Sequence, residues 1–266
     1  MKLRIGFGLS IVALLSGCAI AVGVPLEAKT ELVPQGTLRA AINFGNPILA
    51  TRTADGGMRG VSIDLARALA SELNVALEFV TFESAGHVVA SVPEQSWDVA
   101  FLAIDPARGR DMLQTNPYLI IEGAYLVGAD SPIRSNDEVD RDGVRIAVGK
   151  GSAYDLYLSR TLKHAQIVYA PTSPAVTDLF VAQKLDVAAG VKQQLQADAK
   201  RLPGLRVLEG RFMVIQQAMA TQIGRNAGAA YLNKFVEEMK ASGLIQQYLA
   251  RQGIQGAAVA PPGPAR

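Results

Sequence analysis

The 266-residue sequence predicts an α/β protein built from two doubly wound lobes that two long strands join. Three observations support this fold class. Residues 38–104 alternate apolar runs and helical patterns in the order β-α-β-α-β, which is typical of a mainly parallel lobe. The same alternation restarts at Val144. Two longer apolar runs, residues 119–127 and 213–221, lie between the blocks. Such an arrangement predicts a cleft between the lobes, with ligand near the carboxyl ends of the strands.

The first lobe is predicted from changes of hydrophobic period. Leu38–Asn43 reads as a strand, and a Gly- and Asn-containing loop follows it. Ser62 is then placed to cap a helix, because apolar residues recur after it at helical spacing. That stripe consists of Leu65, Ala66, Leu69 and Leu73. Apolar residues alternate over residues 75–79, which indicates a strand, and residues 97–104 form an apolar run that indicates a buried strand.

The second lobe repeats this pattern. Val144–Val148 is predicted as a strand, and Ser152 is placed to cap a helix over residues 153–163. Ser173-Pro174 opens another helix, with proline at its first position. The remaining predicted elements are strands 166–170 and 186–189 and helices 191–200, 227–240 and 244–251. We place lobe 1 at residues 36–122 and 218–254 and lobe 2 at residues 123–217.

The N-terminus has the pattern of a secretory signal. A basic start, Met1–Arg4, precedes an apolar run that is too short to span a bilayer. Leu15-Ser16-Gly17-Cys18 resembles a bacterial lipobox, so we expect cleavage of residues 1–17, lipidation of Cys18 and a tether over residues 18–35. The alternative is cleavage after Ala19-Ile20-Ala21, which would leave a soluble periplasmic protein. Both readings place the mature chain outside the cytoplasm.

Composition excludes several function classes. Without residues 1–17 the chain has 24 basic and 24 acidic residues, a balance that does not favour nucleic acid as a partner. Cys18 is the only cysteine, so no internal disulfide forms. His87 and His164 have no metal-ligand spacing around them, and no cofactor motif is present, so neither metal nor cofactor is expected. Residues 255–266 are rich in Pro, Ala and Gly and are expected to be disordered. The protein is expected to be a monomer.

Arg108 is the strongest candidate for ligand contact. It follows the predicted buried strand 97–104 through Asp105-Pro106-Ala107. A guanidinium at the carboxyl end of a buried strand offers a rigid fork of donors, and a carboxylate matches that fork. The alternative is an arginine in an ordinary surface loop.

Several motifs in fixed order resemble one known family. They are Gly60–Ala66, Trp97–Val99, Asp105–Arg108 with Pro117-Tyr118, Val148–Ser152, Lys184–Ala188 and Phe235–Gly243. Together they resemble the bacterial extracellular solute-binding protein family 3, the polar-amino-acid-type receptors of ABC importers. The resemblance implies a type II periplasmic-binding-protein fold that closes about a hinge. It also implies a small-molecule solute as ligand and an inner-membrane ABC permease as partner.

The resemblance assigns roles to four positions. Arg108 falls on the arginine that grips the ligand's α-carboxylate. Ala103 falls where Ser or Thr is usual, so only its backbone N–H remains as a donor. Gly151-Ser152 match a turn whose amides face an anionic group at a helix N-terminus, although Ser152 also suits a plain N-cap.

Two positions depart from the family pattern. Ser84 stands where an aromatic side chain usually stacks on the ligand. Phe44, beside Asn43 at the predicted cleft edge, is the alternative candidate for an aromatic ring that stacks on the ligand. The other possibility for Phe44 is packing in the core. For Gln216-Gln217, which interrupts an apolar strand, exposure at an edge is favoured over ligand contact.

The second departure concerns charge. Val191, beside Lys192, stands where an acid usually pairs with the ligand's α-ammonium. A buried ammonium without a counter-charge is costly, so the sequence argues against an ordinary α-amino acid as ligand. Substitutes for the missing acid are Glu83, Asn43 and Asp105.

Two other function classes remain open at this point. Periplasmic cyclohexadienyl dehydratases resemble this family, and an enzyme of that kind would need a carboxyl acid or base in the cleft. Glu83 and Glu122 are the candidates, and nothing in the sequence marks either as catalytic. A sensory module would require a membrane kinase as its partner.

Overall fold

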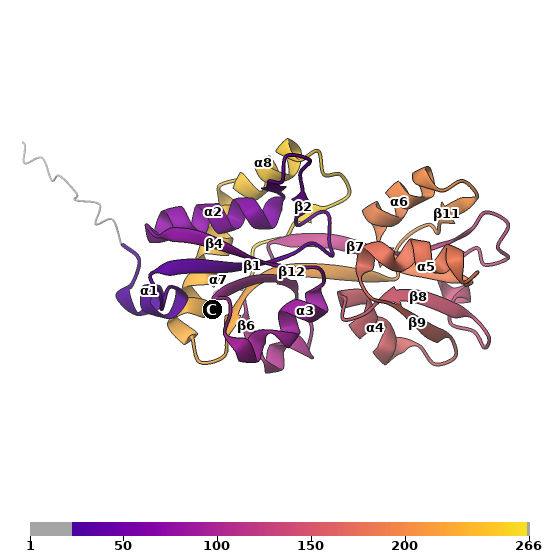
Figure 1. The fold of residues 1–266 in the computed structure, drawn as a ribbon, viewed down its shortest axis with the longest axis horizontal. Coiled ribbons are helices and arrows are strands. Elements are labelled where there is room, and N and C mark those ends of the chain that lie inside the picture. Colours follow the sequence, from indigo (N-terminus) through magenta and orange to yellow (C-terminus); the bar gives the residue numbers. More distant parts are fainter. Residues whose placement is uncertain (1–22, 265–266) are drawn as a thin grey trace, which may run out of the picture.

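The computed structural model describes residues 23–264, so the predicted signal peptide and the lipidation of Cys18 lie outside the described residues. Two lobes lie side by side along the long axis of the molecule, and two long strands, β7 (Leu119–Gly128) and β12 (Met213–Gln222), run between them (Figure 1). The predicted α/β fold class with two joined lobes is confirmed. In the described part of the chain, no helix is long and apolar enough to cross a membrane.

One continuous path of strands passes through both lobes. Its order is β4-β1-β5-β12-β7-β10-β8-β9. The two crossing strands are antiparallel to each other, with Met213 opposite Gly123 and Gln217 opposite Leu119. Each crossing strand also pairs with a strand of one lobe, β12 with β5 and β7 with β10. The crossing strands are therefore part of both sheets, and they fix where the lobes meet.

Lobe 1 has helices on both faces of its sheet. Strands β1 (Thr37–Asn43), β4 (Ala76–Phe82) and β5 (Val99–Ala103) are parallel. Ala40 and Ile42 face a core shared with the helices α2 (Val61–Leu73), α7 (Asn226–Ala241) and α8 (Leu244–Arg251). Ala41, between them, faces the core under α3 (Ala85–Ala90). This alternation is what a parallel sheet buried on both faces requires.

A buried charge network anchors the strand that leads to Arg108. The carboxylate of Asp98, which is wholly buried, receives hydrogen bonds from Arg39 at 2.8 and 2.9 Å and from Arg225 at 2.9 Å. Trp97 donates its indole N–H to Ser91 Oγ at 2.9 Å. The Trp97-Asp98 pair thus connects β1, the start of β5 and the segment before α7.

Lobe 2 is organised in the same way. Strands β8 (Arg145–Gly149), β9 (Gln166–Ala170) and β10 (Val187–Val191) are parallel. Helix α4 (Ala153–Thr161) covers one face of the sheet, and α5 (Val176–Ala182) and α6 (Lys192–Arg201) cover the other. The short strands of the molecule are β2 (Thr51–Arg52), β3 (Met58–Arg59), β6 (Met112–Gln114), β11 (Leu205–Val207) and β13 (Ala258–Val259).

The chain near the N-terminus differs from the expected tether. Residues 26–32 form the helix α1 (Leu26–Leu32), which packs on α7 through buried Ala28 and Leu32. Glu31 accepts a hydrogen bond from the backbone N–H of Gly228 at 2.7 Å. Close packing is possible because Gly228 has no side chain, since a Cβ there would meet Leu32 at 3.0 Å.

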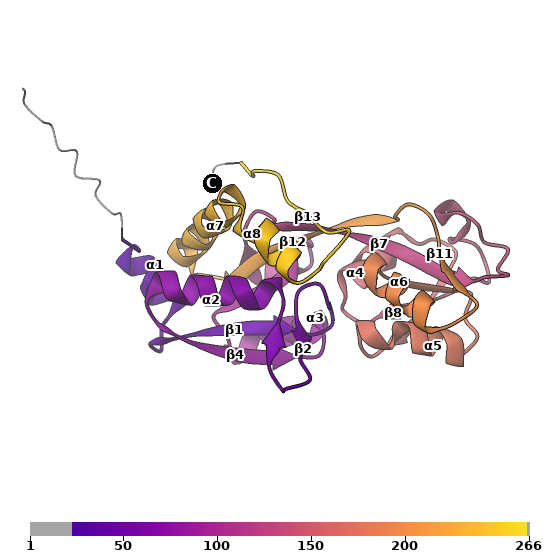
Figure 2. The ribbon, with the colours of Figure 1, turned by 90° about the horizontal axis from the view of Figure 1, so that it is seen from above.

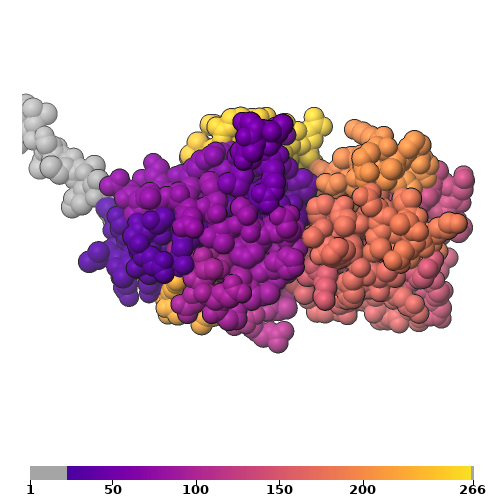
Figure 3. Space-filling model, in the orientation of Figure 1, coloured from indigo at the N-terminus to yellow at the C-terminus, as the bar shows by residue number. Residues whose placement is uncertain are grey.

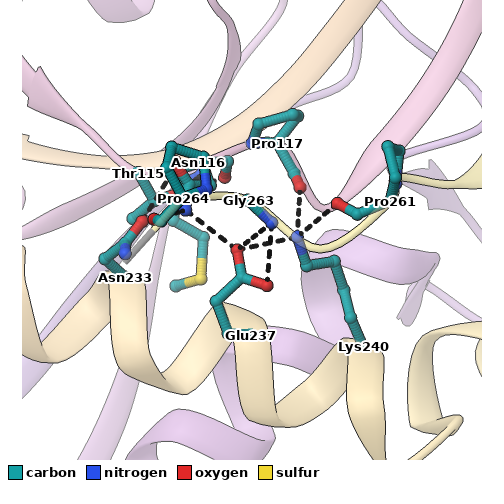
Figure 4. A network of polar contacts seen from close by, with 10 residues as sticks. Thr115, Asn116, Pro117, Asn233, Glu237, Lys240, Pro261, Gly263 and Pro264 are labelled. Atoms are coloured by element: carbon teal, nitrogen blue, oxygen red, sulfur yellow. Dashed lines mark hydrogen bonds and ion pairs between the residues drawn. The ribbon is translucent and has the colours of Figure 1, made fainter. Parts of the chain in front are cut away.

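The C-terminal segment also differs from the expected disordered tail. Residues 255–264 cross over lobe 1, and β13 pairs with β7 (Figure 2). Lys240 on α7 donates to the carbonyls of Pro261 at 2.9 Å and Pro117 at 3.2 Å (Figure 4). The carboxylate of Glu237 accepts from the Gly263 N–H. Because these partners are distant in sequence, the composition of the tail alone does not reveal them.

Candidate ligand-binding site

The cavity between the lobes lies where the sequence predicts a site. It opens at the carboxyl ends of β1, β5, β8 and β10 and against the crossing strand β12. Its volume is about 30 Å³, and the two lobes are in contact on the face that Figure 3 shows. Residues that line it and matter below are Asn43, Asn46, Ala103, Arg108, Ser152, Val191 and Gln217.

Arg108 lies at the boundary of the two lobes. It begins a short 3-10 turn after β5, and its side chain is almost wholly buried. Nη1 donates to the Ala103 carbonyl at 3.0 Å, and Nη2 donates across the cleft to the Gly151 carbonyl at 3.0 Å. Its Nε is buried and has no hydrogen-bond partner within residues 23–264. Burial lowers the pKa of Arg108 to about 10, against a smaller opposing effect of Asp105, so the guanidinium is charged at neutral pH.

Asp105 is engaged in a second contact between the lobes. Its carboxylate, which is buried, receives two hydrogen bonds from Arg160 on α4, at 2.8 and 3.2 Å. It also accepts from the Ala107 N–H at 2.8 Å. Asp105 does not line the cavity. Its charge therefore holds lobe 1 to lobe 2 and does not replace the missing acid in this arrangement.

The turn at Gly151-Ser152 begins α4, and Ser152 caps this helix as predicted by accepting from the Asp155 N–H at 3.0 Å. The Gly151 N–H, which the resemblance assigns to an anionic ligand group, donates to Asp155 Oδ2 at 2.7 Å. The Ser152 N–H donates to the Gly149 carbonyl at 3.1 Å. Both amides thus have partners inside the protein. The spacing Ser152-x-x-Asp155 at a helix start could have indicated this, because it is close to a capping box.

Val191 lines the cavity at the position where the family usually has an acid. Lys192 next to it is turned away, because its Nζ donates to Glu122 on β7 at 2.7 Å. Arg211 binds the other oxygen of Glu122 at 2.8 Å. The hydrogen bond from Lys192 and then that from Arg211 lower the pKa of Glu122. Glu122 is therefore an ionised partner of two cations outside the cavity.

Three further residues that the sequence predicted for the site do not line the cavity. Glu83 is exposed and pairs with Arg52 at 2.6 Å. The ring of Phe44 has the same Arg52 guanidinium at 4.0 Å from its centroid, so it has a stacking partner already. Ser84 is buried, and its Oγ accepts from the His87 N–H to cap α3. Among the described residues, no carboxylate lines this cavity, and no group of three His, Cys, Asp or Glu is arranged to hold a metal.

Gln217 is a cavity residue that the sequence interpretation placed at an exposed edge. The structure shows that only its neighbour Gln216 is exposed, whereas Gln217 is 4% exposed and lines the cavity. The reason is the alternation of side chains along a strand, which sends adjacent residues to opposite faces. The edge prediction is thus wrong for Gln217.

Comparison with known proteins identifies the family of this chain. Residues 38–252 match the model of the bacterial extracellular solute-binding proteins, family 3. The chain belongs to that family. The family resemblance seen in the sequence is thereby confirmed, and this solute-binding protein has the type II fold of its structural neighbours.

Its relatives include both receptors and an enzyme. An L-arginine-binding protein of Pseudomonas aeruginosa is 25% identical over 248 residues, which cover 88% of this chain and 93% of that protein. A cyclohexadienyl dehydratase of the same organism is 22% identical over 247 residues, covering 89% and 91%. The solved structure of a solute receptor for L-cysteine of Neisseria gonorrhoeae has a TM-score of 0.74 at 19% identity, covering 84% of this chain and 92% of that one.

Proposed function

We propose that this solute-binding protein is a receptor for a small carboxylate that lacks an α-ammonium group, and that it delivers this solute to an inner-membrane ABC permease. Family members bind small-molecule solutes and deliver them to ABC transporters. The observation that carries the proposal is the charge of the cavity. A buried guanidinium lines it, and no carboxylate of residues 23–264 does. We further propose that the mature protein is a monomer, anchored to the cell envelope through a lipid on Cys18.

The electrostatics of the cavity support this choice of ligand. An arginine fork matches a carboxylate, and the pairing is strong where water is excluded. The charge of an α-ammonium would lie beside the apolar side chain of Val191 without a counter-charge, which costs several kcal/mol by order of magnitude. The two acids that were candidates for this counter-charge are engaged elsewhere, Asp105 with Arg160 and Glu83 with Arg52.

A dehydratase is the second candidate, because one relative in the comparison has that activity. Acid–base catalysis requires a side chain within hydrogen-bond reach of the reacting group. Glu122 pairs with two cations outside the cavity and Glu83 is exposed, so neither carboxyl group faces the space beside Arg108. This placement favours a receptor over an enzyme.

A thermal-shift screen tests the proposal. The panel contains keto acids, hydroxy acids, aliphatic and aromatic monocarboxylates, dicarboxylates and the ordinary L-amino acids. A ligand at a hundredfold excess over its dissociation constant stabilises the native state by about 2.7 kcal/mol, which shifts the melting temperature measurably. We expect shifts with amine-free carboxylates and none with ordinary amino acids. Turnover of prephenate by the purified protein would instead favour the dehydratase.

A further inference from the structure

We propose that Gln217 selects ligands with a hydroxyl group beside the carboxylate, so that the solute is a hydroxy acid. This inference rests on the proposed function, because it assumes that Arg108 holds the carboxylate. Gln217 is not among the positions that the family resemblance assigns. It lies on the crossing strand β12, which both lobes share.

The backbone around Gln217 is held on both sides. Residue 217 pairs with Ala103 on β5 and with Leu119 on β7. Its carbonyl accepts from the Tyr118 N–H at 2.8 Å. A side chain on a strand in the middle of a sheet is positioned more precisely than one on a loop. The amide group of Gln217 is therefore presented to the cavity from a fixed point.

The side-chain oxygen of Gln217 has no partner among residues 23–264. This atom, Oε1, is wholly buried. A buried polar group without a partner is unfavourable, so such a group in a cavity points to a ligand that completes it. The same holds for the neighbouring Arg108 Nε, which is also buried and unpartnered.

Two other amides of the cavity offer donors. Asn43 Oδ1 accepts from the Gly45 N–H at 2.8 Å, and Asn46 Oδ1 accepts from the Ile48 N–H at 3.1 Å. These bonds fix the orientation of both amides, because a backbone N–H requires the oxygen, and they leave each Nδ2 as a donor. Donors suit the oxygens of a carboxylate. The amide of Gln217 adds an acceptor to them.

A hydroxyl group is the substituent that best fits this set. It donates and accepts at once, as the amide of Gln217 does, and it is neutral, so it needs no counter-charge. A hydrogen in its place would leave the Gln217 amide unpaired. An ammonium would satisfy Oε1 as a donor, but its charge would have no partner beside Val191.

Matched triads of acids that differ only at the α-carbon test the inference by titration calorimetry. They are lactate, propionate and alanine; 2-hydroxybutyrate, butyrate and 2-aminobutyrate; and mandelate, phenylacetate and phenylglycine, with both enantiomers of each chiral acid. We expect one triad in which the hydroxy acid binds roughly 5- to 150-fold more tightly than the unsubstituted acid, the factor that an unpaired buried polar group implies.

Two variants assign that preference to Gln217. Gln217→Met keeps the length of the side chain and should remove the preference for the hydroxyl, because the unsubstituted acid then no longer leaves a buried amide unpaired. Gln216→Met is the matched control, because Gln216 is the exposed neighbour on the same strand, and it should behave as the wild type. If Gln217→Met does not fold, Gln217→Glu serves instead, and its carboxylate should shift the preference to the amino acid of the triad.

The outcomes separate the inference from the proposed function. Equal binding of hydroxy and unsubstituted acids, or a preference that persists in Gln217→Met, overturns the role of Gln217 while the carboxylate receptor stands. If no acid of any triad binds, the role of Gln217 is overturned as well. The proposed function is then decided separately, by whether other carboxylates in the wider screen bind in a way that depends on Arg108.

Discussion

The guanidinium of Arg108 requires both hydrogen-bond acceptors and a negative charge from its partner. Its guanidinium is buried and charged, and its present partners are the neutral carbonyls of Ala103 and Gly151. A carboxylate would satisfy both the donors and the charge. Carbonyl oxygens satisfy only the donors. In the proposed function, the ligand carboxylate therefore competes with the Gly151 carbonyl for Nη2 and also reaches Nε.

Substitution of Arg108 should remove most of the binding energy. Arg108→Ala leaves the ligand carboxylate without its partner, which typically costs about 2–5 kcal/mol, or roughly 30- to 4000-fold in affinity. Arg108→Lys should also weaken binding, since a point charge does not reproduce the fork. Titration calorimetry measures both variants, with circular dichroism as the control for folding. A dissociation constant unchanged by Arg108→Ala would remove this residue from the site.

Individual site residues were predictable to different degrees. Arg108 could be placed because a strongly apolar strand fixes which end of the sheet its following loop occupies. Gln217 could not be placed in the same way. Its neighbours in the sheet are Ala103 and Leu119, which are far away in the sequence, so the pattern of its own strand does not reveal which face of the strand meets the cleft. The partner of the Gly151 N–H was missed for a local reason, since the side chain of Asp155 competes with a ligand for the same donor.

At the scale of elements, the crossing strand β7 has its own charged clamp. Glu122 is bound by Lys192 from the start of α6 and by Arg211 from the segment before β12. These two ion pairs connect β7 to helix α6 of lobe 2 and to the segment that leads into β12. The side chain of Glu122 is 27% exposed, so water screens the pairs only in part. The clamp lies at the hinge, where the angle between the lobes is set.

The clamp gives the protein a defined pH dependence. Lys192 and Arg211 lower the pKa of Glu122 in the folded state. The clamp therefore stabilises the fold at pH values above the ordinary pKa of glutamate, and this stabilisation disappears as pH falls through the lowered pKa of Glu122. Glu122→Gln should lower the free energy of unfolding by about 0.5–1 kcal/mol at pH 7, and this deficit should vanish as pH falls through the lowered pKa of Glu122. Denaturant titrations at several pH values measure this. Glu83→Gln, at the exposed pair with Arg52, is the control and should have a smaller effect. A Glu122→Gln deficit that grows toward low pH would contradict the assignment.

Element type was predictable from hydrophobic period, and element ends and terminal segments were less so. The strands at Leu38, Val99 and Val187 and the helices of both lobes follow from patterns of period 2 or 3.6 within each segment. Helix α1 and residues 255–264 are held by partners from α7, such as Glu237 and Lys240, that lie far away in the sequence. A terminal segment whose stability comes from such contacts has no local signal.

At the scale of the whole molecule, entry of a solute requires the lobes to separate. A cavity of about 30 Å³ holds little more than one water molecule. The contacts that close it are the hydrogen bond from Arg108 to Gly151, the ion pair of Asp105 with Arg160, and the approach of the backbones at Gly86 and Gly151. Opening must break all three and bend the crossing strands.

A methyl group added where the backbones of Gly86 and Gly151 approach each other should therefore weaken ligand binding. A Cβ on Gly86 would stand 3.3 Å from Gly151 Cα, so Gly86→Ala opposes close contact of the lobes. Alanine is at least as favourable as glycine in a helix, so lobe 1 should keep its stability. We expect a loss of ligand affinity of up to about tenfold, or 1.4 kcal/mol, with no fall in the melting temperature of the protein alone. Gly128→Ala, where a Cβ meets nothing within 4 Å, is the control. Unchanged affinity in Gly86→Ala would show that ligand binding does not require this contact.

In the proposed function, the cavity accepts a carboxylate, and no acid of residues 23–264 lines it to pair with an α-ammonium. Titration calorimetry of one acid from the screen and of its α-amino counterpart, with the wild type and with Val191→Asp, tests this selectivity. We expect the wild type to bind the amine-free acid more tightly, by about tenfold or more. Val191→Asp should narrow or reverse this difference in affinity, because aspartate supplies the missing counter-charge. Tighter binding of the α-amino acid by the wild type would show that the cavity is not selective for amine-free carboxylates.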